Sequence, residues 1–367
     1  MAGREFLRNF DLMLFASAFF LIALGLVTLW SLSPGQFFLR QLIWVAIGTA
    51  VFVFFTFFDY RIFVNHGGAL LAALIFAVLM LVVLYFFGPK TRGVTSWFWF
   101  GSVAAQPVEF VKILLILVLA KYFSRRHIEI YQIRHLFVSG LYVIFPAFFV
   151  MVQPALGSAL ILIAIWLAFV LFSGIRFRHF AATFALFAVF AVIAWYGLLA
   201  PYQKTRITAF LDPYRDPKGA GYNVIQAMTA VGSGRIWGKG IGYGTQSHLN
   251  FLPEAETDFI FAAFAEETGF LGAAIFVSFF TFFLWRVLGV GFAAQDNFSK
   301  LFVLGFTTLI FSQGVVHIGM NLGLLPVTGI TLPFVSYGGS SMVTLMAGVG
   351  ILESIRIRSR SDIMDLA

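Results

Sequence analysis

Two groups of ionisable residues lie beside long apolar runs, where they could take part in catalysis or binding. The first is Glu109 and Lys112, three positions apart in QPVEFVKILLILVLAKYF and therefore on one helical face. Ionisable groups at membrane depth are costly and normally face the protein interior or a water-filled cavity. The pair is therefore either a structural ion pair near a helix end or part of a cavity wall where Lys112 meets an anionic substrate.

The second group is centred on Asp258, which ends the stretch FLPEAETD and precedes the apolar run Phe259 to Ala265. Low-dielectric surroundings disfavour a charged carboxylate and suit it to accept a proton. The alternative is an N-cap for the next helix, with Glu266 and Glu267 as first-turn acids favoured by the helix dipole. Position alone favours the cap.

Two glycine-rich segments lie near these residues. Residues 238–244, GKGIGYG, fit neither GxxxxGK[ST] nor a strand-led GxGxxG, so a tight turn is expected, although its amides could cradle a diphosphate. Residues 321–341, NLGLLPVTGITLPFVSYGGSS, break the backbone just before the last apolar run, which is tolerated where the break is buried or lines a cavity. His248 and His317 are isolated and lack the spacing of metal ligands.

The composition indicates that these residues belong to a membrane protein. Of 367 residues, 60% are hydrophobic and 11% are charged, whereas soluble domains carry about 25% charged residues. The net charge is +8, and the basic residues lie in short gaps between apolar runs. A nucleic-acid-binding face instead has clustered basic residues. We therefore expect no nucleic acid partner. The absence of cysteine excludes disulfides and thiolate metal sites.

Ten apolar stretches are long enough, or nearly so, to cross a bilayer core, which needs about 20 residues per helix. They lie near 12–31, 39–58, 68–87, 106–123, 136–153, 156–174, 180–200, 264–285, 300–319 and 335–354. The bases in the short gaps on the N-terminal side are Arg4, Arg8, Arg61, Lys121, Arg125, Arg126, Arg134, Arg176, Arg178, Arg286, Lys300, Arg356, Arg358 and Arg360, against Arg40, Lys90 and Arg92 opposite. The positive-inside rule then makes both termini cytoplasmic.

One gap is long. Residues 201–258, between the seventh and eighth predicted spans, form a large extracytoplasmic loop in this topology. Long ordered loops are usually functional. The sequence thus predicts one all-α polytopic membrane domain, residues 1–367, with about ten transmembrane helices and a catalytic loop at about 201–258.

Four stretches together make the chain resemble the SEDS family (shape, elongation, division and sporulation) of RodA, FtsW and SpoVE proteins. They are Gln106 to Glu109 with Lys112, FLDPYRDPKGAGY at 210–222, GKGIGYGTQSHLNFLPEAETDFIFA, and GLLPVTGITLPFVSYGGSS. Within the family, GTQS at 244–247 followed by Leu249 and FLPE at 251–254 resembles the RodA branch of cell elongation more than the division branch.

The resemblance implies a peptidoglycan glycosyltransferase in the plasma (inner) membrane, with its active site on the extracytoplasmic face. Such an enzyme polymerises lipid II, an undecaprenyl-diphosphate-linked disaccharide-pentapeptide, into β-1,4-linked glycan during cell elongation and cell-shape maintenance. The implied partners are a class B penicillin-binding protein transpeptidase and other elongation-complex proteins. The family's essential carboxylate falls on Asp258, which favours function over the cap. Ala155 stands where many relatives carry Asp, so either Glu109 is the remaining partner of Lys112 or the activity is altered.

The motifs and the resemblance together give candidate catalytic and substrate-binding residues. Asp258 is expected to be the general base on the acceptor 4-hydroxyl, and Lys112 is the first candidate to stabilise the leaving diphosphate. The remaining candidate substrate-binding residues are Glu109, Arg92, Arg206, Gln246, Glu254, Ser336 and Ser340. A divalent cation, Mg²⁺ or Mn²⁺, could share the task of Lys112. No dedicated metal cluster and no organic cofactor are expected.

Two alternatives belong to other functional classes. A lipid II flippase would use Glu109 and Lys112 as gating charges, but transporters often show inverted repeats, and the sequence shows none. A non-catalytic scaffold that recruits a transpeptidase would retain its function without the Asp258 carboxylate.

Overall fold

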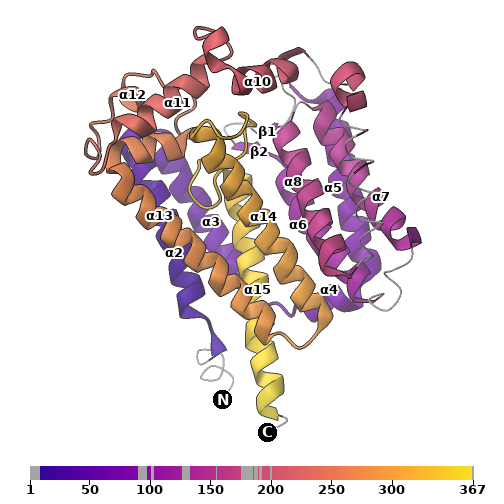
Figure 1. Cartoon of the computed structure of the whole chain (residues 1–367). Helices are drawn as coiled ribbons and strands as arrows, with labels where there is room; N and C mark the ends of the chain where they lie inside the picture. The colour runs from indigo at the N-terminus through magenta and orange to yellow at the C-terminus, as the bar shows by residue number, and fades with distance from the viewer. Residues whose placement is uncertain are drawn as a thin grey trace.

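The computed structural model describes residues 9–89, 97–100, 103–125, 133–153, 155–174, 192–198 and 201–365, together with Ala185 and Val189. Most of these residues form a bundle of long helices (Figure 1). Seven helices are long and apolar enough to cross a membrane within this described part: α2 (Leu12–Leu32), α3 (Phe37–Phe57), α5 (Gly67–Phe87), α7 (Ile133–Val152), α13 (Ile260–Ala293), α14 (Asn297–Asn321) and α15 (Gly339–Asp365). The chain is therefore a multi-pass membrane protein.

Two further helices coincide with predicted spans. α6 (Pro107–Ser124) is mostly apolar and carries the charged residues Glu109, Lys112 and Lys121, and α8 (Leu156–Phe172) has 17 residues. The short helix α4 (Arg61–Asn65) connects α3 to α5. The seventh predicted span, 180–200, falls mostly outside the described residues, although Ala194–Leu198 form a π-helical turn within it.

Two features of the fold go beyond the sequence prediction. The fold is not entirely helical, because β1 (Phe98–Phe100) and β2 (Val103–Ala105) form an antiparallel hairpin before α6, with Phe98 paired to Ala105. The predicted loop at 201–258 contains short helices: α10 (Pro201–Leu211), the 3₁₀ turn η2 (Pro213–Arg215), α11 (Tyr222–Ser233) and α12 (Thr245–His248). Figure 1 shows α10, α11 and α12 at the end of the bundle opposite the start of α2 and the end of α15.

The helices that position the site pack closely because small residues lie at their contacts. α15 packs against α3, where a side chain on Gly350 would meet the Phe52 carbonyl oxygen at 2.6 Å. α14 packs against α6, α8 and α13. Its Gly305 faces Ile116 of α6 and Phe169 of α8. Small residues let membrane helices approach closely and gain van der Waals contact.

α13 contains a sharp break at Gly269, where φ is 69° and ψ is −167°. The break separates a short buried segment, Ile260 to Thr268, from the long segment that begins at Phe270. A Cβ on Gly269 would overlap the backbone nitrogen of Gly238. Both the conformation and the close approach therefore require glycine at this position.

We expect Gly269→Ala to destabilise the protein. The backbone angles of Gly269 lie in a region open essentially to glycine alone, where another residue costs about 1–3 kcal/mol. The overlap with Gly238 adds to that cost. Gly289 in the same helix is the matched control, because a Cβ there meets nothing within 4 Å. Thermal unfolding in detergent should show a lower midpoint for Gly269→Ala and an unchanged or higher midpoint for Gly289→Ala. Equal midpoints would contradict this account of the break.

Candidate active site

Asp258 lies half-buried in the turn that leads into α13. Its backbone carbonyl oxygen accepts a hydrogen bond from Asn321 Nδ2 at 3.0 Å, and Asn321 Oδ1 accepts one from the Ala262 N–H at 3.0 Å. The last residue of α14 therefore ties the Asp258 turn to the first turn of α13. The N-cap of α13 is Phe259, without a side-chain cap, so the N-cap interpretation of Asp258 is wrong.

The segment between α14 and α15 lies along the other side of this turn. Ser336 Oγ donates to the Thr257 carbonyl oxygen at 2.8 Å, and the Tyr337 N–H donates to the Glu256 carbonyl oxygen at 2.9 Å. A Cβ added to Gly329 would lie 3.6 Å from Asp258 Oδ2. The glycine-rich segment that the sequence singled out is thus in direct contact with the Asp258 turn.

The same segment reaches the start of α6. The Gln106 N–H donates to Ser340 Oγ at 2.9 Å, one helical turn before Glu109. Lys112 Nζ lies 2.6 Å from Glu109 Oε1, and both side chains are buried. The structure therefore confirms the predicted ion pair, whereas the role of Lys112 in binding a substrate stays a prediction.

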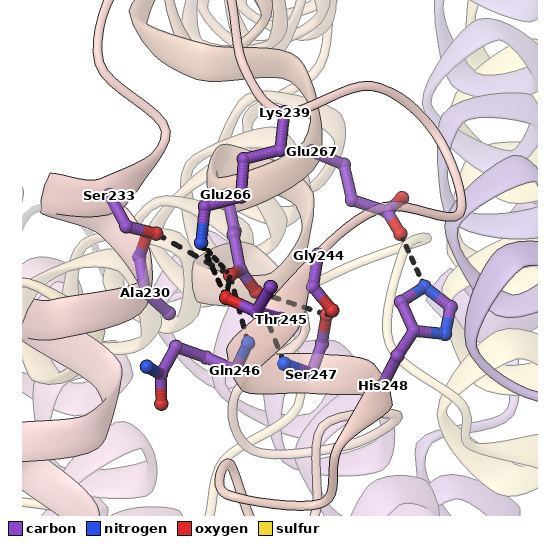
Figure 2. A network of polar contacts seen from close by, with 10 residues as sticks. All are labelled: Ala230, Ser233, Lys239, Gly244, Thr245, Gln246, Ser247, His248, Glu266 and Glu267. Atoms are coloured by element: carbon purple, nitrogen blue, oxygen red, sulfur yellow. Dashed lines mark hydrogen bonds and ion pairs between the residues drawn. The ribbon is translucent and has the colours of Figure 1, made fainter.

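A second polar centre lies below the glycine turn and is built around Glu266 (Figure 2). The Glu266 carboxylate is fully buried and lies 2.7 Å from Lys239 Nζ. It also accepts hydrogen bonds from the Gln246 N–H at 2.9 Å and from the N–H and Oγ of Ser247, both at 3.1 Å. Glu266 therefore holds the start of α12 against α13.

Glu267 forms the neighbouring part of this centre. Its Oε1 accepts hydrogen bonds from Ser31 Oγ at 2.6 Å and from the Gly242 N–H at 3.1 Å, and it lies 2.9 Å from His248 Nε2. Since α13 begins at Ile260, neither Glu266 nor Glu267 is a first-turn acid, and that expectation is wrong. Both carboxylates instead hold residues 239–248 against α13, and Glu267 also binds Ser31 of α2.

The glycine segment 238–244 is a series of tight turns, as expected. Gly238, Gly240 and Gly242 all have positive φ, from 79° to 97°. The N–H groups of Lys239 and Gly240 donate to the carbonyl oxygens of Glu266 and Glu267. The Gly242 N–H is bound by the Glu267 carboxylate. These three amides therefore have partners within the protein, which disfavours a diphosphate cradle at this turn.

Three of the remaining candidate residues, Gln246, Glu254 and Arg206, lie in the segment 201–258. Gln246 contributes its N–H to Glu266, and its carbonyl oxygen accepts from the Leu252 N–H at 2.9 Å. Glu254 is exposed and lines a cavity of about 120 Å³ between Leu32 and the turn before Asp258. This volume is below the 300–1,000 Å³ of typical ligand pockets. Arg206 is exposed on α10, and Arg92 lies outside the described residues.

Four residues that organise the site were not among the sequence candidates: Glu266, Glu267, Lys239 and Asn321. The available signal was the adjacent pair Glu266 and Glu267, since two carboxylates within an apolar helix need partners from elsewhere in the fold. In the described ranges, no group of three His, Cys, Asp or Glu side chains could hold a metal ion.

We expect Glu266→Gln to loosen the segment 239–247. The amide of Gln replaces one of the two carboxylate oxygens with an N–H donor, which then opposes either the Lys239 ammonium at the Oε1 position or the Ser247 N–H at the Oε2 position. Hydrogen bonds to charged groups contribute about 1.5–3 kcal/mol each. Hydrogen exchange should therefore become faster at the amides of residues 239–247. Glu256→Gln makes the same chemical change at a side chain outside this network and is the control. Unchanged protection in Glu266→Gln would contradict the assigned role.

Comparison with known proteins identifies the family. Residues 9–361 match the family model of FtsW, RodA and SpoVE, described as cell cycle protein. The chain belongs to the FtsW/RodA/SpoVE family. Stage V sporulation protein E of Bacillus subtilis is 35% identical over 363 residues, which cover 95% of this chain and 98% of that protein. Peptidoglycan glycosyltransferase MrdB of Escherichia coli K12 is 40% identical over 282 residues, which cover 77% and 76% of the two chains.

Two solved structures, one of them a RodA protein, have the same fold. A chain from a peptidoglycan synthase complex that coordinates polymerization and crosslinking superposes with a TM-score of 0.81 at 29% identity, covering 95% of this chain and 98% of that chain. The rod shape determining protein RodA of Thermus thermophilus superposes with a TM-score of 0.71 at 26% identity, covering 95% and 96%. The family resemblance seen in the sequence is therefore confirmed in the fold.

Proposed function

We propose that this chain is a peptidoglycan glycosyltransferase that polymerises lipid II into β-1,4-linked glycan during cell elongation and cell-shape maintenance. The similarity to the glycosyltransferase MrdB and to RodA supports the activity. The observation that supports Asp258 as the active-site residue is the fixed position of its turn, which Asn321 holds on one side and Ser336 on the other. A general base needs such a fixed position relative to the hydroxyl that it deprotonates.

The proposed topology is a single domain, residues 1–367, in the plasma membrane. The seven candidate spans, α6 and α8 are nine of the ten proposed transmembrane helices. The tenth is the region 180–200, which is proposed from its apolar sequence. Both termini are then cytoplasmic and the segment 201–258, between the seventh and eighth helices, is extracytoplasmic. The start of α2 and the end of α15 lie at one end of the bundle, which supports this arrangement (Figure 1).

The proposed reaction is one displacement at an anomeric carbon. Asp258 accepts the proton of the GlcNAc 4-hydroxyl of one lipid II molecule, and that oxygen attacks the anomeric carbon of a lipid-linked MurNAc. The bond to undecaprenyl diphosphate breaks, which converts an α linkage into a β-1,4 bond. Lys112, with Arg92 or Arg206, stabilises the charge on the leaving diphosphate.

The other candidate residues, Glu109, Gln246, Glu254, Ser336 and Ser340, are proposed to line or orient the substrate site. A divalent cation, Mg²⁺ or Mn²⁺, would supply charge neutralisation of the diphosphate when bound. Magnesium commonly binds through substrate phosphates and only one or two carboxylates, so a cluster of protein ligands is not required. No organic cofactor takes part in the proposed reaction.

The proposed partner is a class B penicillin-binding protein transpeptidase that crosslinks the new glycan, together with other elongation-complex proteins. The support is the similarity to a chain of a peptidoglycan synthase complex that coordinates polymerization and crosslinking. The exposed outer segment, which carries α10 to α12, offers a surface outside the helical bundle for such contacts (Figure 1).

The test is glycan polymerisation from purified lipid II and a divalent cation, with and without the cognate transpeptidase, in the presence of penicillin to block crosslinking. A ladder of glycan strands is the expected result. No ladder with a verified partner would overturn the proposal. Lipid II translocation in vesicles would then point to a flippase, and partner binding without either activity would point to a scaffold.

A further inference from the structure

Six apolar residues from two distant parts of the sequence are exposed near the break in α13. The set consists of Ile236, Trp237, Ile241, Tyr243, Phe270 and Leu271 and is called the outer patch here. Trp237 is 79% exposed, Tyr243 is 76% exposed and Phe270 is 70% exposed. Large aromatic side chains with this exposure in water are unfavourable, so the outer patch needs a partner.

Backbone hydrogen bonds fix the outer patch to the first residues of the long segment of α13. The Phe270 N–H donates to the Arg235 carbonyl oxygen at 2.8 Å, and the Leu271 N–H donates to the Ile236 carbonyl oxygen at 3.1 Å. The two glycines at the contact, Gly238 and Gly269, leave no room for side chains between the two backbones. The outer patch therefore cannot move in depth independently of α13.

The position along α13 favours lipid as the partner. α13 is long and apolar enough to span a bilayer, and Phe270 and Leu271 begin the long part of this helix after its break at Gly269. Ile275, one turn further along, is also exposed, so the outer patch continues into the lipid-facing surface of the helix. Tryptophan and tyrosine are the residues enriched where a membrane protein crosses the headgroup region.

We propose that the outer patch inserts into the headgroup region of the bilayer leaflet at the α10–α12 end. Lys239, between Trp237 and Ile241, points instead into the protein and reaches Glu266 (Figure 2). Glu266 in turn binds the N–H groups of Gln246 and Ser247. Through these contacts the bilayer supports the segment that leads to the Asp258 turn. The depth of the outer patch in the bilayer then fixes the height of the Asp258 turn above the membrane.

The absence of cysteine from the 367 residues allows a direct test by site-specific labelling. Trp237→Cys is labelled with a nitroxide in lipid nanodiscs without any partner protein. Lys218→Cys, at an exposed charged position between η2 and α11, gives the water reference, and Ile275→Cys on α13 gives the lipid reference. Collision rates with a water-soluble nickel chelate and with oxygen, which concentrates in lipid, are measured for each label.

The nickel collision rate at position 237 is expected to be several-fold lower than at position 218, and the oxygen collision rate is expected to be higher. Both rates should be closer to those at position 275 than to those at position 218. Tyr243→Cys is labelled as a second position and should agree, which guards against a local effect of losing the tryptophan. Nickel accessibility at 237 and 243 equal to that at 218 would overturn the proposal. Protection that appears only after the transpeptidase is added would also overturn it and identify a protein-docking surface.

Discussion

Replacing Asp258 with Asn is expected to reduce the rate of glycan polymerisation by about 10² to 10⁴, the contribution typical of a general base. Asn has nearly the same size as Asp but cannot accept the proton of the attacking hydroxyl. The hydrogen bond from Asn321 reaches the backbone carbonyl of residue 258, which the substitution retains. The rate is measured from purified lipid II with the transpeptidase and penicillin present.

Glu256→Gln is the matched control, because it removes a carboxylate two residues earlier in the same turn. Its carbonyl oxygen, which accepts from the Tyr337 N–H, is also retained. We expect this variant to keep most of the polymerase activity. Size-exclusion profiles and thermal midpoints identical to those of the parent protein establish that both variants are folded. Equal rates for Asp258→Asn and the parent protein would exclude Asp258 as the base.

The long helices could be predicted because apolar length alone decides which segments cross a bilayer. The predicted ranges at 12–31, 39–58 and 68–87 differ from α2, α3 and α5 by at most two residues at either end. The helical structure of 201–258 was not predicted, since its glycines, prolines and charges are typical of a loop. Tertiary contacts override that composition: α11 packs on both α13 and α14.

The candidate site was predictable in part. Asp258 and the pair Glu109 and Lys112 were found because charged residues next to apolar runs are conspicuous in a membrane protein. The partners of Glu267 were not found, because Ser31 lies 236 positions away in the sequence. Periodicity and local motifs carry no information about such a distance, so the network around Glu266 and Glu267 required the fold.

The second large effect is expected at the ion pair in α6. Glu109→Gln leaves Lys112, whose side chain is 1% exposed, without its charged partner. Breaking a buried ion pair by removing one member costs about 3–5 kcal/mol. We expect a correspondingly large loss of stability, measured by titration with SDS and followed by circular dichroism. An unchanged unfolding midpoint would show that the pair is not structurally important.

The double variant Glu109→Gln with Lys112→Met separates the two interpretations of this pair. It removes both charges together, so part of the lost stability should return, because no uncompensated charge is left buried. If the pair is only structural, polymerisation returns with the stability. If Lys112 stabilises the leaving diphosphate, the double variant folds but polymerises slowly, because the Lys112 charge is missing. The Asp258 turn is unchanged in this variant, so the slow rate would be due to the loss of that charge. We expect the second outcome, and full activity in the double variant would remove Lys112 from the proposed reaction.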